Sequence, residues 1–397
     1  MPVTAVSDAV VIVAAKRTPL GAFQGQLAAL SAPELASVAI AAALGLAGIR
    51  GEDVDEAILG CVLPAGLGQA PARQAVLGAG LPKSVPCTTV NKVCGSGMKA
   101  SMLGHDQILA GVAETILVGG MESMSNAPYL LPKARGGYRL GHGQLVDHML
   151  CDGLQNPYDQ LLMGNFAELC AQKYGFSRED QDAFATESVR RAIRATVQGE
   201  LGLEIAALPL PGMAGATLMT QDETPFRCDI SKIPSLKPAF KQGGTVTPAN
   251  SSSISDGAAA LVLMRESLAT RQGLKPLARF VGHATYAQSP EWFTTAPVGA
   301  IDKLQRRLDW SPAEVDLYEI NEAFAVVTLA AMRDLRLPHE KVNVNGGACA
   351  LGHPIGATGA RIVVTLIHAL RNRGLRRGIA SLCLGGGEAT AVAVEVI

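Results

Sequence analysis

The sequence predicts an α/β protein of two similar halves, with an inserted loop region interrupting the first half. Its 397 residues exceed what one hydrophobic core usually organises, so we expect more than one structural unit. Aromatic residues make up only 4%, while glycine occurs 43 times, which favours aliphatic β/α packing with close backbone approaches. Strand-like and helix-like segments also alternate twice along the chain, as in sheets covered by helices.

The first half alternates between short apolar strands and amphipathic helices. Strands are predicted at 10–14, 57–62, 87–90 and 115–118, and helices at 33–46, 73–79 and 96–110. From Ser123 to Thr247 the chain becomes rich in Pro, Gly, Tyr and charge, with one long polar helix at 178–197. This region is predicted to be an inserted excursion, after which an apolar strand at 258–264 completes the first sheet.

The same alternation begins again after Pro276. Strands are predicted at 277–282, 317–320, 342–344, 379–384 and 390–396, and helices at 298–308, 322–335 and 355–371. We therefore divide the chain into an N-terminal half (1–122), an inserted loop region (123–247), a return to the N-terminal half (248–272) and a C-terminal half (273–397).

Both halves end in the same series of events. A short strand leads through a Gly-rich turn into a long helix, and an apolar strand then enters a glycine cluster. The first half shows this at 88–97 and 117–120, and the second at 342–354 and 383–387. An internal duplication follows, in which the two halves meet and their glycine turns line one shared site.

Charge and hydropathy exclude several classes of function. The formal net charge is −1, so nothing indicates electrostatic binding of nucleic acid or of a membrane surface. No stretch reaches the roughly 18 apolar residues that span a bilayer. The short apolar stretch 9–15 precedes Lys16 and Arg17, the reverse of a signal peptide, so we expect a cytoplasmic protein.

Most of the eight cysteines should be reduced core residues, because they form no C-x-x-C pair and no disulfide-like spacing. Cys94 is the first candidate exception, since it lies in the segment 91–98, where a strand gives way to a helix. A helix N-terminus lowers a thiol's pKa and favours the thiolate. Gly95 and Gly97 let a substrate and a facing backbone approach. A buried cysteine at a tight turn explains this segment equally well.

Three residues of the second half are further candidates. His353 precedes Pro354 at a predicted helix start, and the helix dipole favours a neutral imidazole there. Cys383 ends an apolar strand before three consecutive glycines, which usually mark the close approach of a ligand or another segment. Asn321 occupies a strand-to-helix turn, where a plain N-cap role would also explain it.

Other uses of these residues have less support. The Cys and His candidates are far apart in sequence and lack the short ligand pairs of zinc sites, so we expect no metal. No G-x-G-x-x-G follows a strand and no P-loop is present, so dinucleotide and phosphoryl-transfer chemistry are poorly supported.

Taken in order, five motifs resemble the thiolase family, most closely its acetyl-CoA acetyltransferases (acetoacetyl-CoA thiolases). They are Asn-Lys-Val-Cys-Gly-Ser-Gly (91–97), Gly-Gly-Met-Glu-Ser-Met-Ser (119–125), Asn-Glu-Ala-Phe-Ala (321–325), Gly-His-Pro-Ile-Gly-Ala-Thr-Gly-Ala (352–360) and Cys-Leu-Gly-Gly-Gly (383–387). The segments 227–232 and 246–252 support that branch, and the resemblance runs from Val10 to the C-terminus. It implies a five-layer αβαβα fold of two related halves plus a loop domain that holds CoA.

The resemblance also implies a ping-pong Claisen condensation of two acetyl-CoA, or thiolysis of 3-ketoacyl-CoA. Cys94 would carry the acyl group after His353 helps to ionise it, and Cys383 would be the base that forms the enolate. His353 and a water held by Asn321 would stabilise the enolate oxygen, and the N–H groups of Cys94 and Gly385 would form a second oxyanion hole.

The CoA contacts implied by the resemblance are Arg227 and Lys232 at the nucleotide end and Ser252 along the pantetheine. The substrates would be acyl-CoA thioesters, with no further cofactor. This chain has Leu162-Met163-Gly164 where many relatives have His-Met-Gly, so one polar pantetheine contact is missing. Val189 stands where some mitochondrial relatives have a potassium-binding tyrosine, so we expect no potassium activation.

The resemblance leaves some alternatives open. A broader-chain degradative 3-ketoacyl-CoA thiolase of β-oxidation shares these residues. A β-ketoacyl synthase has the same fold, but Cys383 as the second base favours a thiolase. A catalytically silent lipid- or CoA-binding protein would not need the intact Cys/His/Cys/Asn set. We also expect a homo-oligomer, either a dimer or a tetramer joined through the loop 129–145.

Overall fold

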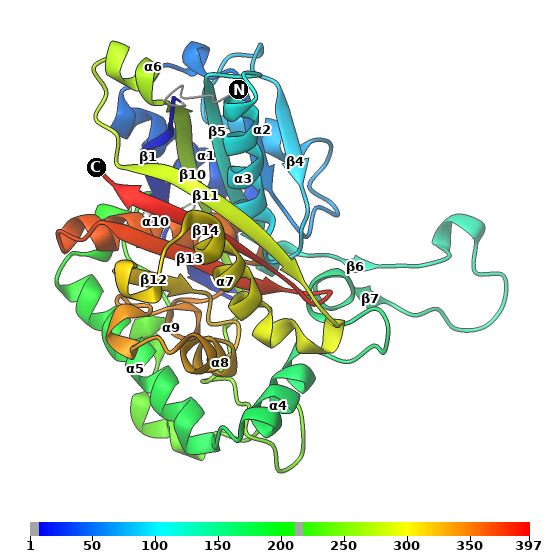
Figure 1. The fold of residues 1–397 in the computed structure, drawn as a ribbon. Coiled ribbons are helices and arrows are strands. Elements are labelled where there is room, and N and C mark those ends of the chain that lie inside the picture. Colours follow the sequence, from blue (N-terminus) through cyan, green and yellow to red (C-terminus); the bar gives the residue numbers. More distant parts are fainter. Residues whose placement is uncertain (1–7, 211–216) are drawn as a thin grey trace.

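The computed structural model describes residues 8–210 and 217–397. A ten-stranded sheet forms its core, in the order β12-β13-β14-β11-β1-β10-β5-β3-β4, with β2 paired to β10 (Figure 1). The strands are β1 (Val10–Arg17), β2 (Gly21–Ala22), β3 (Glu56–Gly60), β4 (Cys87–Val90), β5 (Thr115–Ser123), β10 (Ser255–Arg265), β11 (Ala278–Ala287), β12 (Leu317–Ile320), β13 (Arg377–Leu384) and β14 (Glu388–Val396). The helices around it are α1 (Ala32–Ala47), α2 (Pro71–Gly78), α3 (Ser96–Leu109), α6 (Glu266–Arg271), α7 (Ala296–Leu308), α8 (Ala325–Leu335), α9 (Ala348–Leu351) and α10 (Ile355–Asn372).

The strand order confirms the internal duplication. The halves meet where β1 pairs antiparallel with β11, through Val11–Arg279 and Ile12–Ala278. From this seam the first half runs outward as β1-β10-β5-β3-β4 and the second as β11-β14-β13-β12. Each step also has the same direction, antiparallel for the inner pairs and parallel for β5–β3 and β13–β12.

The second half has no counterpart of β4, so the strand predicted at 342–344 is wrong. Val342 makes only an isolated bridge to Tyr318 of β12. The next residue, Asn343, has φ +48°, a left-handed conformation that interrupts an extended strand. Its side-chain amide instead bonds both backbone groups of Ile320, accepting from the N–H and donating to the carbonyl at 2.8 Å each. A side chain thus replaces the strand pairing.

The layers run helix, sheet, helix, sheet, helix. Helices α1 and α2 pack on the outer face of the first-half strands, α3 and α10 lie between the two halves, and α7 covers the outer face of the second half. Strand β10 shows how one sequence serves two layers. Ala258, Ala260 and Val262 face the α1 side, while Leu261 and Leu263 face the central helices. Burial on both faces explains its continuous apolar sequence.

Glycines let the two central helices, α3 and α10, approach closely. A Cβ on Gly97 would lie 2.9 Å from the backbone nitrogen of Ala360, and one on Gly359 would lie 2.4 Å from that of Met98. Neither position could accept a side chain without moving backbone. Because each helix starts next to a candidate residue, this packing brings the Cys94 turn and the His353 turn together.

The inserted region contains more helix than the sequence predicted. Helix α5 (Arg178–Val197) lies at its expected bounds, but α4 (Met163–Tyr174) was not predicted. Leu162 stands at the N-cap of α4 and gives no polar start signal, unlike the capping box of Ser177 and Asp180 at α5. Two small hairpins complete the region, β6 (Tyr129–Leu130) with β7 (Val146–Asp147) and β8 (Leu208–Pro209) with β9 (Leu218–Met219).

A buried ionic cluster anchors the inserted region to the core. The guanidinium of Arg17 in β1 lies 2.5 Å from Glu204 and 2.6 Å from Asp222, and all three side chains are buried. The two carboxylates raise the pKa of Arg17 against the effect of burial. Removing one partner of such a pair costs about 3–5 kcal/mol because a buried charge is left uncompensated.

Within the described residues, no helix is long and apolar enough to cross a bilayer.

Candidate active site

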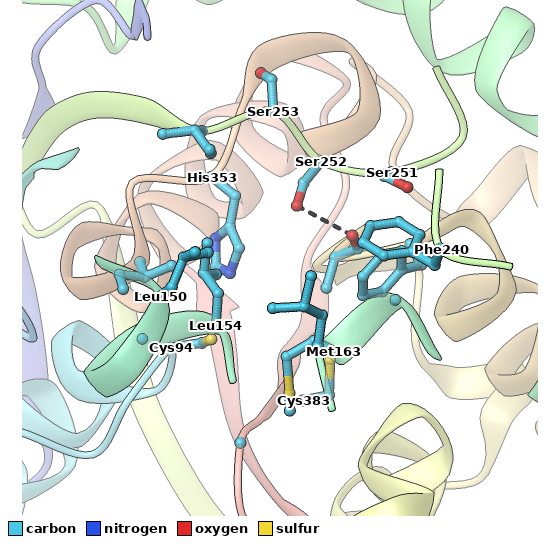
Figure 2. Close-up of a pocket in the computed structure, with 18 of the residues that line it drawn as sticks. Cys94, Leu150, Leu154, Met163, Phe240, Ser251, Ser252, Ser253, His353 and Cys383 are labelled. Carbon is cyan, nitrogen blue, oxygen red and sulfur yellow. Dashed lines mark hydrogen bonds between the residues drawn. The ribbon is translucent and has the colours of Figure 1, made fainter. Parts of the chain in front are cut away.

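A cavity of about 390 Å³ opens where the two halves and the inserted region meet. The first half contributes Cys94, and the second contributes His353, Cys383 and Gly385. Figure 2 shows the His353 ring and both cysteine side chains at this cavity. The remaining walls are mostly apolar and come largely from the inserted region and the segment that follows it: Leu150, Leu154, Leu162, Met163, Phe240, Ser251, Ser252, Ser253 and Ile254.

The turn between β4 and α3 presents Cys94 at the start of the helix. Val93, just before it, has φ +47°, an unfavourable conformation for a β-branched residue. Local hydrogen bonds hold this conformation. The Val93 N–H donates to Asn91 Oδ1 at 2.9 Å, and the Ser96 hydroxyl donates to the Val93 carbonyl at 2.6 Å. Such stored strain is typical of a side chain held in a functional orientation.

The pKa of Cys94 differs from the sequence prediction. Burial raises it to about 12, and the carboxyl of Glu122 adds to the rise. The backbone N–H groups of Gly385 and Cys94 favour the thiolate and so lower the pKa, but they do not outweigh burial. The expectation that the helix N-terminus leaves a lowered pKa is therefore wrong. Cys94 rests as a thiol until a base removes its proton.

His353 is a neutral imidazole with one nitrogen free to accept a proton. Burial, with the nearby charge of Arg361, lowers its pKa to about 3. The Thr358 hydroxyl donates to the Pro354 carbonyl at 2.9 Å, so it can only accept from His353 Nδ1, which lies 2.6 Å away. Nδ1 therefore carries the proton, and buried Nε2, which has no partner among the described residues, keeps its lone pair. The predicted neutral state is confirmed, but its cause is burial rather than a helix dipole.

Cys383 is 1% exposed at the end of β13. Burial raises its pKa well above the usual range, and Cys94 raises it further because a thiolate at one sulfur disfavours a thiolate at the other. The pair therefore favours having at most one sulfur ionised at a time.

The turn after Cys383 needs its glycines for backbone reasons. Gly386 and Gly387 have φ +88° and +83°, and a Cβ on Gly387 would lie 2.3 Å from the Gln288 carbonyl oxygen. This conformation turns the chain back into β14 and leaves Gly385 lining the same cavity as Cys94. The three glycines predicted the close approach of a ligand or another segment. In the structure, the segment that approaches Gly387 is the backbone at Gln288.

Asn321 is buried next to the same strand, and its backbone N–H donates to Ser381 at 3.0 Å. Neither atom of its side-chain amide meets a partner within the described residues. The N-cap explanation is wrong, because α8 begins at Ala325 with Phe324 as its cap. The helix begins later than predicted because Glu322 is buried and accepts hydrogen bonds from Ser188, Asn343 and Cys349.

Glu122 is a buried residue near Cys94 for which the sequence predicts no role. Its carboxylate accepts from the N–H groups of Val62, Leu63 and Gly356 at 3.0, 3.1 and 2.9 Å. Burial raises its pKa to about 7 despite these bonds. A Cβ on Gly356 would lie 2.7 Å from this carboxylate, which explains that glycine. The sequence does contain one indication of a role for Glu122, because it is a charged residue near the end of an otherwise apolar strand.

The three predicted CoA contacts are not gathered at the cavity. Ser252 lines it, with its hydroxyl donating to the Ala323 carbonyl at 3.0 Å (Figure 2). Arg227 and Lys232 do not line it. Arg227 is 59% exposed and pairs with Glu223, and Lys232 is 75% exposed and pairs with Asp229.

One group of possible metal ligands occurs among the described residues, away from the cavity: His105, Asp106 and His283. The Asp106 carboxylate hydrogen-bonds both rings, at 3.1 Å to His105 and 2.8 Å to His283. These bonds account for the arrangement without an ion.

Comparison with known proteins gives one consistent result. Residues 10–267 match the thiolase N-terminal domain and residues 274–396 the thiolase C-terminal domain. The chain is 48% identical to acetyl-CoA acetyltransferase of Schizosaccharomyces pombe, over 98% of this chain and 99% of the relative, and 50% identical to acetyl-CoA acetyltransferase 2 of Arabidopsis thaliana, over 98% and 97%.

Two solved structures agree with this result. The Acat5 thiolase from Ascaris suum, in complex with coenzyme A, has a TM-score of 0.93 at 41% identity, over 98% of this chain and 100% of that one. The Bacillus anthracis acetyl-CoA acetyltransferase has a TM-score of 0.96 at 42% identity, over 98% and 99%. Together with the layered, duplicated fold and the shared cavity, these matches show that the chain belongs to the thiolase family.

Proposed function

We propose that this chain is an acetyl-CoA acetyltransferase, which reversibly condenses two acetyl-CoA into acetoacetyl-CoA and CoA. The observation that carries the proposal is the meeting of two cysteines and one neutral, proton-accepting histidine at a single cavity between the halves. The names of the relatives support the same activity. The residues supply both a nucleophile and a base, so the reaction needs no additional cofactor.

The first half-reaction transfers an acetyl group to Cys94. His353 Nε2 takes the thiol proton, and the sulfur attacks the acetyl-CoA carbonyl. The Cys94 and Gly385 N–H groups, which already favour negative charge on the sulfur, stabilise the oxyanion. The bond from the carbonyl carbon to the CoA sulfur then breaks, and CoA leaves with the proton held by His353. The acetyl group remains as a thioester on Cys94.

The second half-reaction forms the carbon–carbon bond. Cys383 gives its thiol proton to His353 Nε2, and the thiolate so formed removes a methyl proton from a second acetyl-CoA, which returns Cys383 to the thiol. The resulting enolate oxygen is stabilised by His353 and by a water hydrogen-bonded to the buried Asn321 amide. The enolate carbon attacks the acetyl-Cys94 carbonyl, and the Cys94–acyl bond breaks to release acetoacetyl-CoA. The Cys94 thiolate takes the proton held by His353, so both cysteines are thiols and the imidazole is neutral, as at the start.

CoA would extend from this centre across the inserted region. Its pantetheine lies along Ser252 and the apolar wall that includes Leu162, and Arg227 and Lys232 contact the nucleotide end. The exposed positions of both cations suit a solvent-facing phosphate. Val189 is buried in an apolar cluster and offers no oxygen ligand, which supports an enzyme without potassium activation.

The cavity favours short acyl chains over the longer chains that a broad-chain thiolase accepts. Phe293 and Phe324 line it, and Phe293 packs edge-on against Phe166 and Phe324 with ring centroids 6.4 Å apart in each case. In thiolysis assays we expect acetoacetyl-CoA to be the best substrate and 3-ketohexanoyl-CoA and longer substrates to have at least about tenfold lower kcat/KM. Phe293→Ala should reduce this difference in kcat/KM between acetoacetyl-CoA and the longer substrates. A rate that rises with chain length would favour the degradative alternative.

We also propose a homo-oligomer, a dimer or tetramer. The loop between β6 and β7 extends away from the body in Figure 1 and exposes apolar side chains, with Leu140 99% and Leu145 65% exposed. Edge strand β4 is also only partly buried. Light scattering should give a multiple of the 41.2 kDa chain mass, and a monomer would contradict the proposal.

A further inference from the structure

An ion pair joins the Cys94 turn of the first half to the glycine turn of the second. The Lys92 ammonium contacts the Glu388 carboxylate, and the two side chains are 22% and 33% exposed. Lys92 lies two residues before Cys94, and Glu388 begins β14 directly after the three glycines. The pair therefore spans the same gap between the halves as the close approach of Gly385 to Val93, where a Cβ on Gly385 would lie 3.5 Å from Val93 Cγ1.

Backbone contacts hold the glycine turn within the second half, where the Gln288 N–H donates to the Gly387 carbonyl at 2.9 Å. Gly385, Gly386 and Gly387 lack side chains, and a Cβ on Gly386 would meet nothing within 4 Å. Leu384 packs against Gly95 on one side, and Thr390 contacts Met98 on the other. Glu388, directly after the turn, adds an ion pair to Lys92 of the first half.

The Cys94 turn is also under strain that an outside contact can oppose. Val93 lies between Lys92 and Cys94 with φ +47°. The Lys92 N–H donates to Ser96 at 2.8 Å, so the backbone of Lys92 is held within the turn while its side chain reaches the other half. The Lys92 carbonyl also accepts from the Gly95 N–H at 3.0 Å, so a change in the position of Lys92 would reach Cys94 from both sides.

Two other roles for Lys92 have less support. Lys92 does not line the cavity, so it is not placed to contact the pantetheine or the reacting thioester. Its ammonium is also paired with Glu388 and is not among the groups that raise or lower the pKa of the Cys94 thiol. A direct electrostatic activation of the nucleophile is therefore not the role that the geometry indicates.

We propose that Lys92 and Glu388 are positioning residues that hold the two N–H donors of the oxyanion hole, one from each half, around the Cys94 sulfur. The inference rests on the proposed function only for its kinetic consequence. Misplacing a preorganised donor weakens transition-state stabilisation without altering substrate binding. Because the ion pair is partly exposed, its effect on global stability is small.

The test combines hydrogen exchange with acylation kinetics. Lys92→Met and Glu388→Gln each break the pair, and Arg279→Met serves as a matched control because it breaks an ion pair of similar exposure, with Glu266, far from the cavity. We expect faster amide exchange in peptides that contain 383–388 in both test variants but not in the control. Single-turnover acylation by acetyl-CoA should fall about tenfold with unchanged KM.

The double variant, Lys92→Met with Glu388→Gln, should have an acylation rate no lower than that of either single variant, because both substitutions break the same ion pair. Unchanged acylation in either single variant, or losses that add in the double, overturns the positioning role. A different outcome is that the native enzyme forms no acetyl adduct while amide exchange at 383–388 still rises in the test variants. In that case the proposed function is wrong, but the Lys92–Glu388 pair still holds the two turns together. The two failures are thus distinguishable.

Discussion

Replacing Cys94 by serine is expected to abolish the acetyl-enzyme and to lower turnover by at least about 10³-fold. The reason lies in the electrostatics of the site. Burial already raises the pKa of the thiol to about 12, and its partner is a histidine with a pKa lowered to about 3. A serine hydroxyl is a much weaker acid than a thiol, so the same weak base cannot ionise it.

Intact-mass spectrometry after mixing with acetyl-CoA measures this directly. The native chain should gain the mass of one acetyl group, and Cys94→Ser should gain none. Cys151→Ser is the control, because Cys151 is exposed and does not line the cavity, and it should acquire the full adduct. An undiminished adduct in Cys94→Ser would show that another residue carries the acyl group.

Replacing Cys383 by alanine should separate the two half-reactions. The acetyl-enzyme should still form, because Cys94, His353 and Gly385 remain in place. Condensation should fall by about 10²–10⁴-fold, since the cavity loses the thiol proposed to remove the methyl proton. Exchange of the acetyl-CoA methyl protons with deuterated water should fall by the same factor.

A neighbouring thiol provides the matched control. Cys170 is buried in the same apolar cluster as Cys383 but does not line the cavity. Cys170→Ala therefore removes a comparable volume next to the site and should keep methyl exchange and condensation. Full condensation activity in Cys383→Ala would refute its role as the base, whereas equal losses in both variants would indicate that packing, not proton transfer, is responsible.

Local sequence was sufficient for most of the fold. Strands such as β10 are continuous apolar runs because they are buried on both faces, and helix α5 starts at a capping box, so each carries its own signal. The failures occur where a local signal is absent or replaced. Helix α4 starts without a polar cap, and the amide of Asn343 takes the backbone bonds that a strand would otherwise make.

At the site, local patterns are enough to identify the residues that stand at turns before helices and after strands: Cys94, His353, Asn321 and Cys383. The chemical state of these residues depends on how the halves pack. The protonation state of a thiol or imidazole depends on burial and on charged groups that packing brings near, such as Glu122 beside Cys94 and Arg361 beside His353. The Lys92–Glu388 contact likewise joins residues 296 positions apart. Local patterns report backbone conformation, whereas pKa and register between halves depend on packing.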